Sequence, residues 1–139
     1  AARIPKDKVV VTTLISRGGF GEVYQGIYNR QTVAIKTLLP ETRKDIREIN
    51  AFLYEVKLMA SLEHDRITKF IGVAWDSLTD LCAVSEYMEG GDLRGMLTRF
   101  ENVGRPHGFD DDKIKIALHV AHGLTYLHSL RPLVLHRDL

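Results

Sequence analysis

The stretch Ile15-Ser16-Arg17-Gly18-Gly19-Phe20-Gly21-Glu22-Val23 decides how the first half of the chain folds. β-Branched and apolar residues over 9–15 predict a strand before it, and alternation over 22–28 predicts a second strand after it. The glycines therefore occupy the tip of a hairpin, which disfavours the phosphate loops that join a strand to a helix. Such a tip can bring backbone N–H groups close to a phosphate while Phe20 excludes water, although a plain turn is the commoner reason for glycine there.

The residues that follow predict an α+β arrangement. A polar turn at 29–31 leads into a third strand over 32–38, and two more strands are expected over 68–75 and 81–86. Between them, after Asp45, apolar residues recur at helical spacing, at Ile49, Phe52, Val56, Met59 and Ala60. We therefore expect a five-stranded antiparallel sheet with one main helix.

A second region begins after Gly90-Gly91, which breaks the chain. A short helix is expected from Asp92 to Asn102, and a long helix over 112–128 with acidic residues at its start. The long helix has a broad apolar surface, formed by Ile114, Ile116, Ala117, Val120, Ala121, Leu124 and Leu127. A surface of that width requires cover on several sides.

Composition and charge exclude several classes of protein. With 139 residues, 45% of them apolar and 27% charged, the chain is one domain or part of one. A formal net charge of +1 without a basic run argues against nucleic acid, and no apolar run approaches the ~20 residues that span a bilayer. Cys82 is the single cysteine and cannot form an internal disulfide, so a reducing, intracellular (cytoplasmic) compartment is expected.

Three histidines raise the question of a metal site. His119 and His122 lie one turn apart on the predicted long helix, and His128 follows near its end. No cysteine or carboxylate is grouped beside them to complete a ligand set, so a metal site is disfavoured. We interpret them as helix-surface histidines and assign no metal ligand.

The segment Val33-Ala34-Ile35-Lys36 places a lysine at the end of an otherwise apolar strand. An ammonium there needs a partner or a ligand to offset its lost hydration. Glu55 on the following helix is the preferred partner, and Glu48 is a second candidate. The alternative is a lysine whose stem covers apolar surface while its charge stays in water, with a solvated glutamate.

The last residues also form a candidate site. His136-Arg137-Asp138 follows the apolar Leu133-Val134-Leu135, so Asp138 is delivered at the end of a short apolar segment where it can face a substrate. Such a tripeptide is common in isolation. The chain starts with alanine and stops just after this motif, so we expect that both ends are cut.

The order of these elements resembles a eukaryotic protein kinase domain. A glycine-rich hairpin, a lysine ending Val-Ala-Ile-Lys, a helix with a glutamate, and His-Arg-Asp after a long helix follow one another as in that family's signature set. The resemblance covers the whole chain and implies a protein kinase-like fold. Residues 1–88 would be the small lobe and hinge, and residues 89–139 the start of a large lobe truncated after His-Arg-Asp.

The resemblance also implies roles for single residues. Lys36 would hold the α- and β-phosphates of ATP and pair with Glu55, while Asp138 would orient a substrate hydroxyl and accept its proton. Arg137 commonly pairs with a phosphorylated loop in relatives that have this arginine. The implied nucleotide-binding residues are Ile15, Ser16, Arg17, Gly18, Gly19, Phe20, Gly21, Val23, Ala34, Lys36, Ser85, Glu86 and Met88. Ser16 departs from the family pattern, which has glycine at that position.

The implied activity is transfer of the γ-phosphoryl group of ATP to a hydroxyl of a protein substrate, on serine or threonine rather than tyrosine. Mg²⁺ is implied as well, with its protein ligands after Leu139, so this piece by itself is expected to be inactive. The alternatives are a pseudokinase, a nucleotide-binding scaffold module or a non-functional gene fragment. The oligomeric state is left open.

Overall fold

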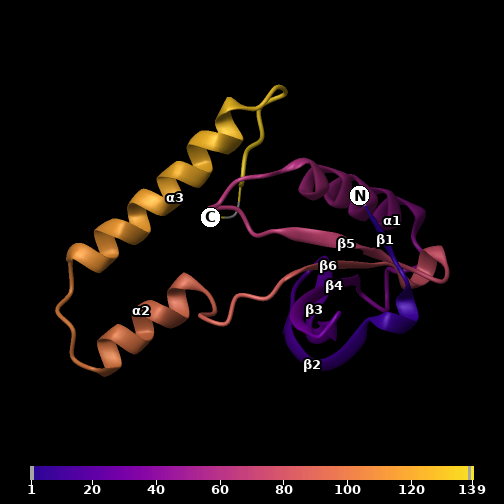
Figure 1. Cartoon of the computed structure of the whole chain (residues 1–139), viewed down its shortest axis with the longest axis horizontal. Coiled ribbons are helices and arrows are strands. Elements are labelled where there is room, and N and C mark those ends of the chain that lie inside the picture. The colour runs from indigo at the N-terminus through magenta and orange to yellow at the C-terminus, as the bar shows by residue number, and fades with distance from the viewer. Residues whose placement is uncertain (1, 138) are drawn as a thin grey trace. The chain divides into compact units, whose positions relative to one another are not determined.

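The computed structural model describes residues 2–137 and 139, and it divides the chain into two compact units (Figure 1). The first unit is Ala1–Glu63 with Thr68–Met88, and the second is His64–Ile67 with Glu89–Leu139. The first holds the sheet and one helix, and the second holds two helices. The α+β class that the sequence predicts is confirmed.

The sheet of the first unit has six strands, in the order β1-β5-β6-β4-β3-β2. The five predicted antiparallel strands are all present, within two residues of their expected bounds. They are β2 (Val10–Arg17), β3 (Gly21–Tyr28), β4 (Gln31–Leu38), β5 (Phe70–Ala74) and β6 (Cys82–Glu86). The additional strand, β1 (Arg3–Ile4), pairs parallel to β5. The sequence did not indicate β1, because two residues are too short to show an alternating pattern.

The additional strand is well anchored. Ile4 is only 2% exposed, and the N–H of Val73 donates to the carbonyl oxygen of Ala2. Gly72 leaves the space for this strand, since a Cβ at that position would lie 2.5 Å from the Ala2 oxygen and 2.7 Å from Ile4 Cδ1. Two short 3₁₀ helices, η1 (Lys6–Lys8) and η2 (Leu78–Asp80), complete the connections of this unit.

Helix α1 (Ile46–Ser61) begins directly after Asp45, as expected, and the side chain of Asp45 caps it by accepting a hydrogen bond from the Arg47 N–H. The expected apolar face is buried at Ile49, Phe52 and Val56. Met59 is half-buried and Ala60 is exposed, because the core that α1 shares with the sheet ends at Val56.

Both faces of the sheet carry a core. On the face that packs against α1, the cluster consists of Leu38, Ile49, Phe52, Val56, Val73, Leu81 and Ala83. On the other face, the cluster consists of Ile4, Val33, Ile35, Ala74, Cys82 and Val84. Burial on two faces is why β5 and β6 read as nearly continuous apolar runs instead of strict alternation.

The second unit contains α2 (Leu93–Asn102) and α3 (Asp111–Ser129), each within one residue of its predicted start and end. The side chain of Asp92 caps α2, and that of Asp110 caps α3. Near its C-terminal end, α3 packs closely on the segment His64–Ile67, where His64 stacks on Tyr126 with ring centroids 4.9 Å apart. Within α3, only Gly123 and Leu127 are fully buried.

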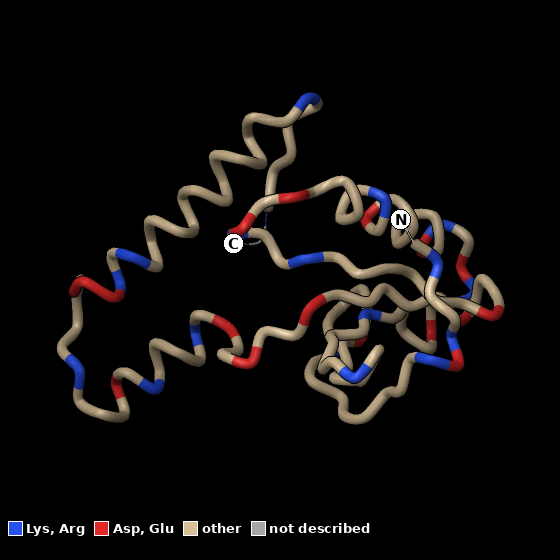
Figure 2. Tube along the Cα trace, viewed as in Figure 1, with Lys and Arg blue, Asp and Glu red and all other residues tan. Residues whose placement is uncertain are grey.

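Charges are mixed along the trace, with basic and acidic residues interspersed in both units (Figure 2). No helix within residues 2–137 is long and apolar enough to cross a membrane. The same residues contain no group of three or more His, Cys, Asp or Glu side chains arranged to hold a metal ion.

Candidate nucleotide site

The register of the sheet brings several predicted site residues onto one face. Val23 lies directly opposite Lys36 across β3 and β4, and Ala34 lies opposite Ser85 across β4 and β6. Directly paired residues point to the same side of a sheet, and so do residues two apart on one strand. Val23, Ala34, Lys36 and Ser85 therefore share one side, called here the Lys36 face. All four are partly accessible to solvent.

Helix α1 contributes Glu55 to this face. The Lys36 Nζ donates to Glu55 Oε1 at 2.5 Å, and the two side chains are 34% and 44% exposed. Glu55, and not Glu48, is thus the partner of Lys36. A half-exposed ion pair contributes little to folding, about 0–1 kcal/mol. Its geometry instead leaves the ammonium oriented and still accessible to an anionic group.

The glycine-rich hairpin closes at its tip through a hydrogen bond of 2.9 Å from the Gly18 N–H to the Gly21 carbonyl oxygen. Gly21 must be glycine, since a Cβ there would lie 2.6 Å from the Thr37 oxygen and 3.6 Å from Lys36 Cε. Phe20 is 79% exposed at the tip. The backbone of the tip therefore approaches the lysine closely, as a phosphate cradle requires.

Ser16 occupies its position without backbone strain. It lies in β2 opposite Val23, and it is not among the residues with positive φ. The departure from the family's glycine is thus accommodated locally. An irregularity between Leu14 and Ser16 inserts Ile15 as an extra residue, so Ile15 and Ser16 together oppose Val23.

Arg17 does not point to the Lys36 face. It pairs with Glu22, which alternates with Val23 along β3 and so lies on the opposite side of the sheet. The guanidinium of Arg17 donates to Glu22 Oε1 at 2.6 Å and to Glu41 Oε1 at 2.5 Å. Of the predicted nucleotide-binding residues, Arg17 can therefore offer only its backbone to a ligand on the Lys36 face.

The residues predicted to form the hinge follow Ser85 at the end of β6. The Glu86 N–H donates to the Lys69 carbonyl oxygen at 2.9 Å, and Glu86 Oε1 accepts from the Lys69 N–H at 2.6 Å. These bonds fix Glu86 at the end of β6. Met88 is 48% exposed, at the last position of the first unit.

The predicted catalytic base, Asp138, lies outside the described residues, so its role stays a prediction. Arg137, next to it, has a positive φ of 67°. A non-glycine residue in this region is uncommon and is often found where the surroundings of a functional site hold the backbone.

The sequence did not reveal the network around Glu22. Glu22 is 7% exposed and is the one charged residue among the buried side chains of the described chain. Besides Arg17, the Tyr24 hydroxyl donates to it, and this bond raises the pKa of Tyr24 above its usual range. A hydrogen bond from its own backbone is the main reason why the pKa of Glu41 lies below its ordinary value. The hydrogen bond from Arg17 and the positive charge of the guanidinium lower this pKa further. The signal that could have indicated the network is the spacing of Arg17 and Glu22 across a tight hairpin.

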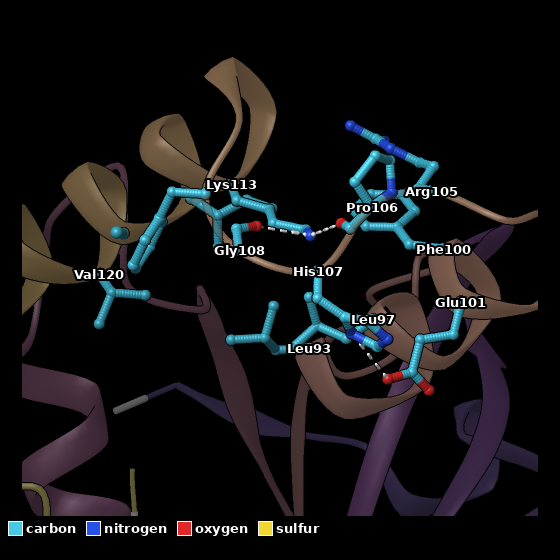
Figure 3. A pocket seen from close by; sticks show the side chains of 13 residues that line it. Leu93, Leu97, Phe100, Glu101, Arg105, Pro106, His107, Gly108, Lys113 and Val120 are labelled. Carbon is cyan, nitrogen blue, oxygen red and sulfur yellow. Dashed lines mark hydrogen bonds and ion pairs between the residues drawn. The ribbon is translucent and has the colours of Figure 1, made fainter.

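A separate apolar groove of about 520 Å³ lies in the second unit, between α2, the loop 103–110 and the start of α3 (Figure 3). Lys113 fixes this loop by donating to the carbonyl oxygens of Pro106 and Gly108. Arg105 stacks on Phe100 and pairs with Asp110. None of the predicted site residues lines this groove.

An α+β unit whose sheet presents a lysine, paired with a glutamate of its single helix and approached by a glycine-rich hairpin, has the architecture of the small lobe of a protein kinase. The family model described as "Protein tyrosine and serine/threonine kinase" matches residues 9–139. The chain belongs to this family. The resemblance to a protein kinase domain that the sequence indicated is therefore confirmed.

Several curated kinases are similar to the chain. The dual specificity protein kinase splA of Dictyostelium discoideum is 37% identical over 128 residues, which are 90% of this chain and 5% of that protein. The serine/threonine-protein kinase TNNI3K of Mus musculus is 33% identical over 127 residues, 91% of this chain and 15% of that protein. The serine/threonine-protein kinase VIK of Arabidopsis thaliana is 34% identical over 126 residues, 91% of this chain and 27% of that protein. The chain thus spans about a quarter or less of these relatives.

Proposed function

We propose that the first unit binds ATP on its Lys36 face, within a protein that transfers the γ-phosphoryl group to a protein hydroxyl. The observation that carries this proposal is the Lys36–Glu55 ion pair beside the tip of the glycine-rich hairpin. An oriented, accessible ammonium suits the charges of the α- and β-phosphates of a nucleotide, and the backbone N–H groups of the tip can contact its phosphates as well. In this proposal Ile15, Val23 and Ala34 contact the adenine ring.

The other proposed site residues have the following roles. Ser85 borders the adenine region, and Glu86 and Met88 offer backbone groups to the edge of the base. Asp138 orients the substrate hydroxyl and accepts its proton. Mg²⁺ bound with the nucleotide would neutralise charge on the phosphates, and we assign none of the described residues as its ligand.

Serine or threonine is the proposed acceptor, since the similar proteins reported above are named as serine/threonine or dual specificity kinases. An intracellular location is part of the proposal, because ATP is the substrate and the single cysteine is a buried free thiol.

The proposal is tested by phosphoryl transfer with the whole protein, using ATP labelled on the γ-phosphate, Mg²⁺ and a mixture of peptides that contain serine, threonine and tyrosine. We expect label on serine or threonine, and its loss in Lys36→Met, whereas Lys57→Met on the exposed side of α1 keeps it. Binding of ATP without transfer would instead favour a nucleotide-binding scaffold. If the protein shows no ATP binding and no phosphoryl transfer, the proposal is contradicted outright.

A further inference from the structure

A network of side chains lies outside the nucleotide contacts described above, and it is formed by Arg17, Glu22, Tyr24 and Glu41. Both carboxylate oxygens of Glu22 have a donor, Arg17 Nη1 at 2.6 Å on Oε1 and the Tyr24 hydroxyl on Oε2. A buried carboxylate depends on such partners, and the loss of one leaves a charge that is only partly compensated. The network is thus centred on the buried carboxylate of Glu22.

Arg17 also connects the hairpin to a different part of the first unit. Its second terminal nitrogen, Nη2, donates to Glu41, which lies between β4 and α1. This connecting segment is ordered by backbone bonds from Arg43 to Leu39 and from Asp45 to Thr42. Because Asp45 caps α1, the guanidinium joins the glycine-rich hairpin to the segment that leads into the helix of Glu55.

A displacement of Glu22 would move the tip of the hairpin directly. Glu22 is adjacent in sequence to Gly21, which already fits against the Thr37 oxygen and Lys36 Cε without room for a side chain. Gly21 in turn accepts the hydrogen bond from Gly18 that closes the tip. A shift of Glu22 therefore moves the backbone atoms that approach Lys36.

We propose that Arg17 is a positioning residue that bridges Glu22 and Glu41 and so holds the glycine-rich tip close to Lys36, where its N–H groups can contact the phosphates of a nucleotide. This inference rests on the proposed function. The side chain of Arg17 lies on the face opposite Lys36, so it acts on the ligand only through the backbone. Arginine suits this role because its planar fork can contact two carboxylates at once, which a lysine ammonium cannot do with the same geometry.

The test compares ATP with adenosine, which lacks phosphates, as ligands of the chain in calorimetric titrations. In Arg17→Ala we expect ATP affinity to fall by about 10-fold, which is the size of one charge-assisted hydrogen bond between an N–H group of the tip and a phosphate. Adenosine affinity should stay within about 2-fold of the wild-type value. Arg17→Lys should recover part of the loss. Arg43→Ala, an exposed arginine of the same connecting segment, serves as the matched control and should change neither affinity.

Three results would overturn the inference. Equal losses for ATP and adenosine would mean that Arg17 only supports folding. An unchanged ATP affinity in Arg17→Ala would mean that the bridge does not position the tip. A full loss of ATP affinity in the Arg43→Ala control would show that the effect is not specific to the bridge.

Hydrogen exchange separates this inference from the proposed function. In the nucleotide-free chain, the Gly18 N–H that closes the tip should exchange faster in Arg17→Ala than in the wild type, by about 10-fold, and at the wild-type rate in Arg43→Ala. If the wild type binds neither ATP nor adenosine, the proposed function fails, and the exchange rate at Gly18 still decides whether Arg17 holds the tip. An unchanged exchange rate of the Gly18 N–H in Arg17→Ala would by itself contradict the proposed role of Arg17.

Discussion

The two units of the chain differ sharply in how they bury apolar residues. All the fully buried hydrophobic side chains of the described chain lie in the first unit except Leu127. In the second unit, Ile114 and Leu118 of α3 are 54% and 51% exposed, although α3 is as regular as α1. An apolar pattern therefore determines that a helix forms, whereas burial also requires a surface on the other side.

The difference has a consequence for stability. The first unit is held by two cores on the two faces of its sheet, so its elements should unfold together. Helices α2 and α3 rest more on local interactions, namely their caps, the loop 103–110 and the contacts around Tyr126. We expect the second unit to open at a lower free energy than the first.

The largest expected effect is in the core of the first unit. Ile35 is completely buried, so Ile35→Ala should lower the free energy of unfolding by about 2–5 kcal/mol through lost burial and a cavity. Ile114→Ala, the matched change on the exposed surface of α3, should cost less than about 0.5 kcal/mol. Chemical denaturation followed by tryptophan fluorescence measures the first change, since Trp75 packs against the core of the first unit, and exchange rates of the α3 amides measure the second. Equal effects would remove the contrast between the units.

A smaller effect is expected where β1 joins the sheet. Gly72→Ala would place a Cβ within 2.7 Å of Ala2 and Ile4 atoms, so β1 should be displaced at a cost of about 1–3 kcal/mol. Gly90→Ala is the control, since no atom lies within 4 Å of a Cβ there. Thermal melts and the exchange rate of the Val73 N–H report the change. Retained protection at Val73 in Gly72→Ala would show that the strand adapts.

The cap of α3 should matter for the second unit. Asp110→Ala removes the hydrogen bond to the Lys113 N–H and should destabilise the helix by about 1 kcal/mol. Asp111→Ala removes only a charge from the first turn and should cost about 0.3 kcal/mol. Exchange rates of the α3 amides measure the two changes. Similar effects of both variants would mean that charge, and not the cap, stabilises this end.

The smallest expected effect depends on pH. Burial lowers the pKa of His119 in α3, and the charges of Arg66, His122 and Lys115 lower it further. The unfolded chain therefore takes up a proton first, so the stability of the second unit should fall as the pH drops through about 6.5 and level off below the folded pKa. His119→Gln should flatten this dependence in exchange measurements between pH 8 and 5. A dependence that persists in the variant would assign it to another group.

Much of the fold could be predicted because its strands and helices are long enough to show a period. The strand β1 could not, since two residues carry no pattern. The bulge at Ile15 also escaped prediction, and its consequence is large, because one extra residue moves the following side chains to the other face. The resemblance to the kinase family placed Arg17 among the ligand contacts, whereas the extra residue turns its side chain to the face opposite Lys36.

The choice between Glu48 and Glu55 shows a similar limit. These residues are seven positions apart, so both lie on nearly the same side of a helix, and periodicity cannot separate them. Their positions along the axis differ by roughly 10 Å, which is decisive for a partner of Lys36. The structure resolves the choice in favour of Glu55, whereas the resemblance to the kinase family had already favoured it.

The central claim is that Lys36, oriented by its ion pair with Glu55, binds the phosphates of a nucleotide. A double-mutant cycle of ATP affinity with Lys36→Ala and Glu55→Gln tests it most directly, with adenosine as the reference ligand and Lys57→Ala as the control. We expect Lys36→Ala to weaken ATP binding by about 10-fold or more and leave adenosine unchanged, with no further loss in the double variant. Wild-type ATP affinity in Lys36→Ala, or additive losses in the cycle, would contradict the account.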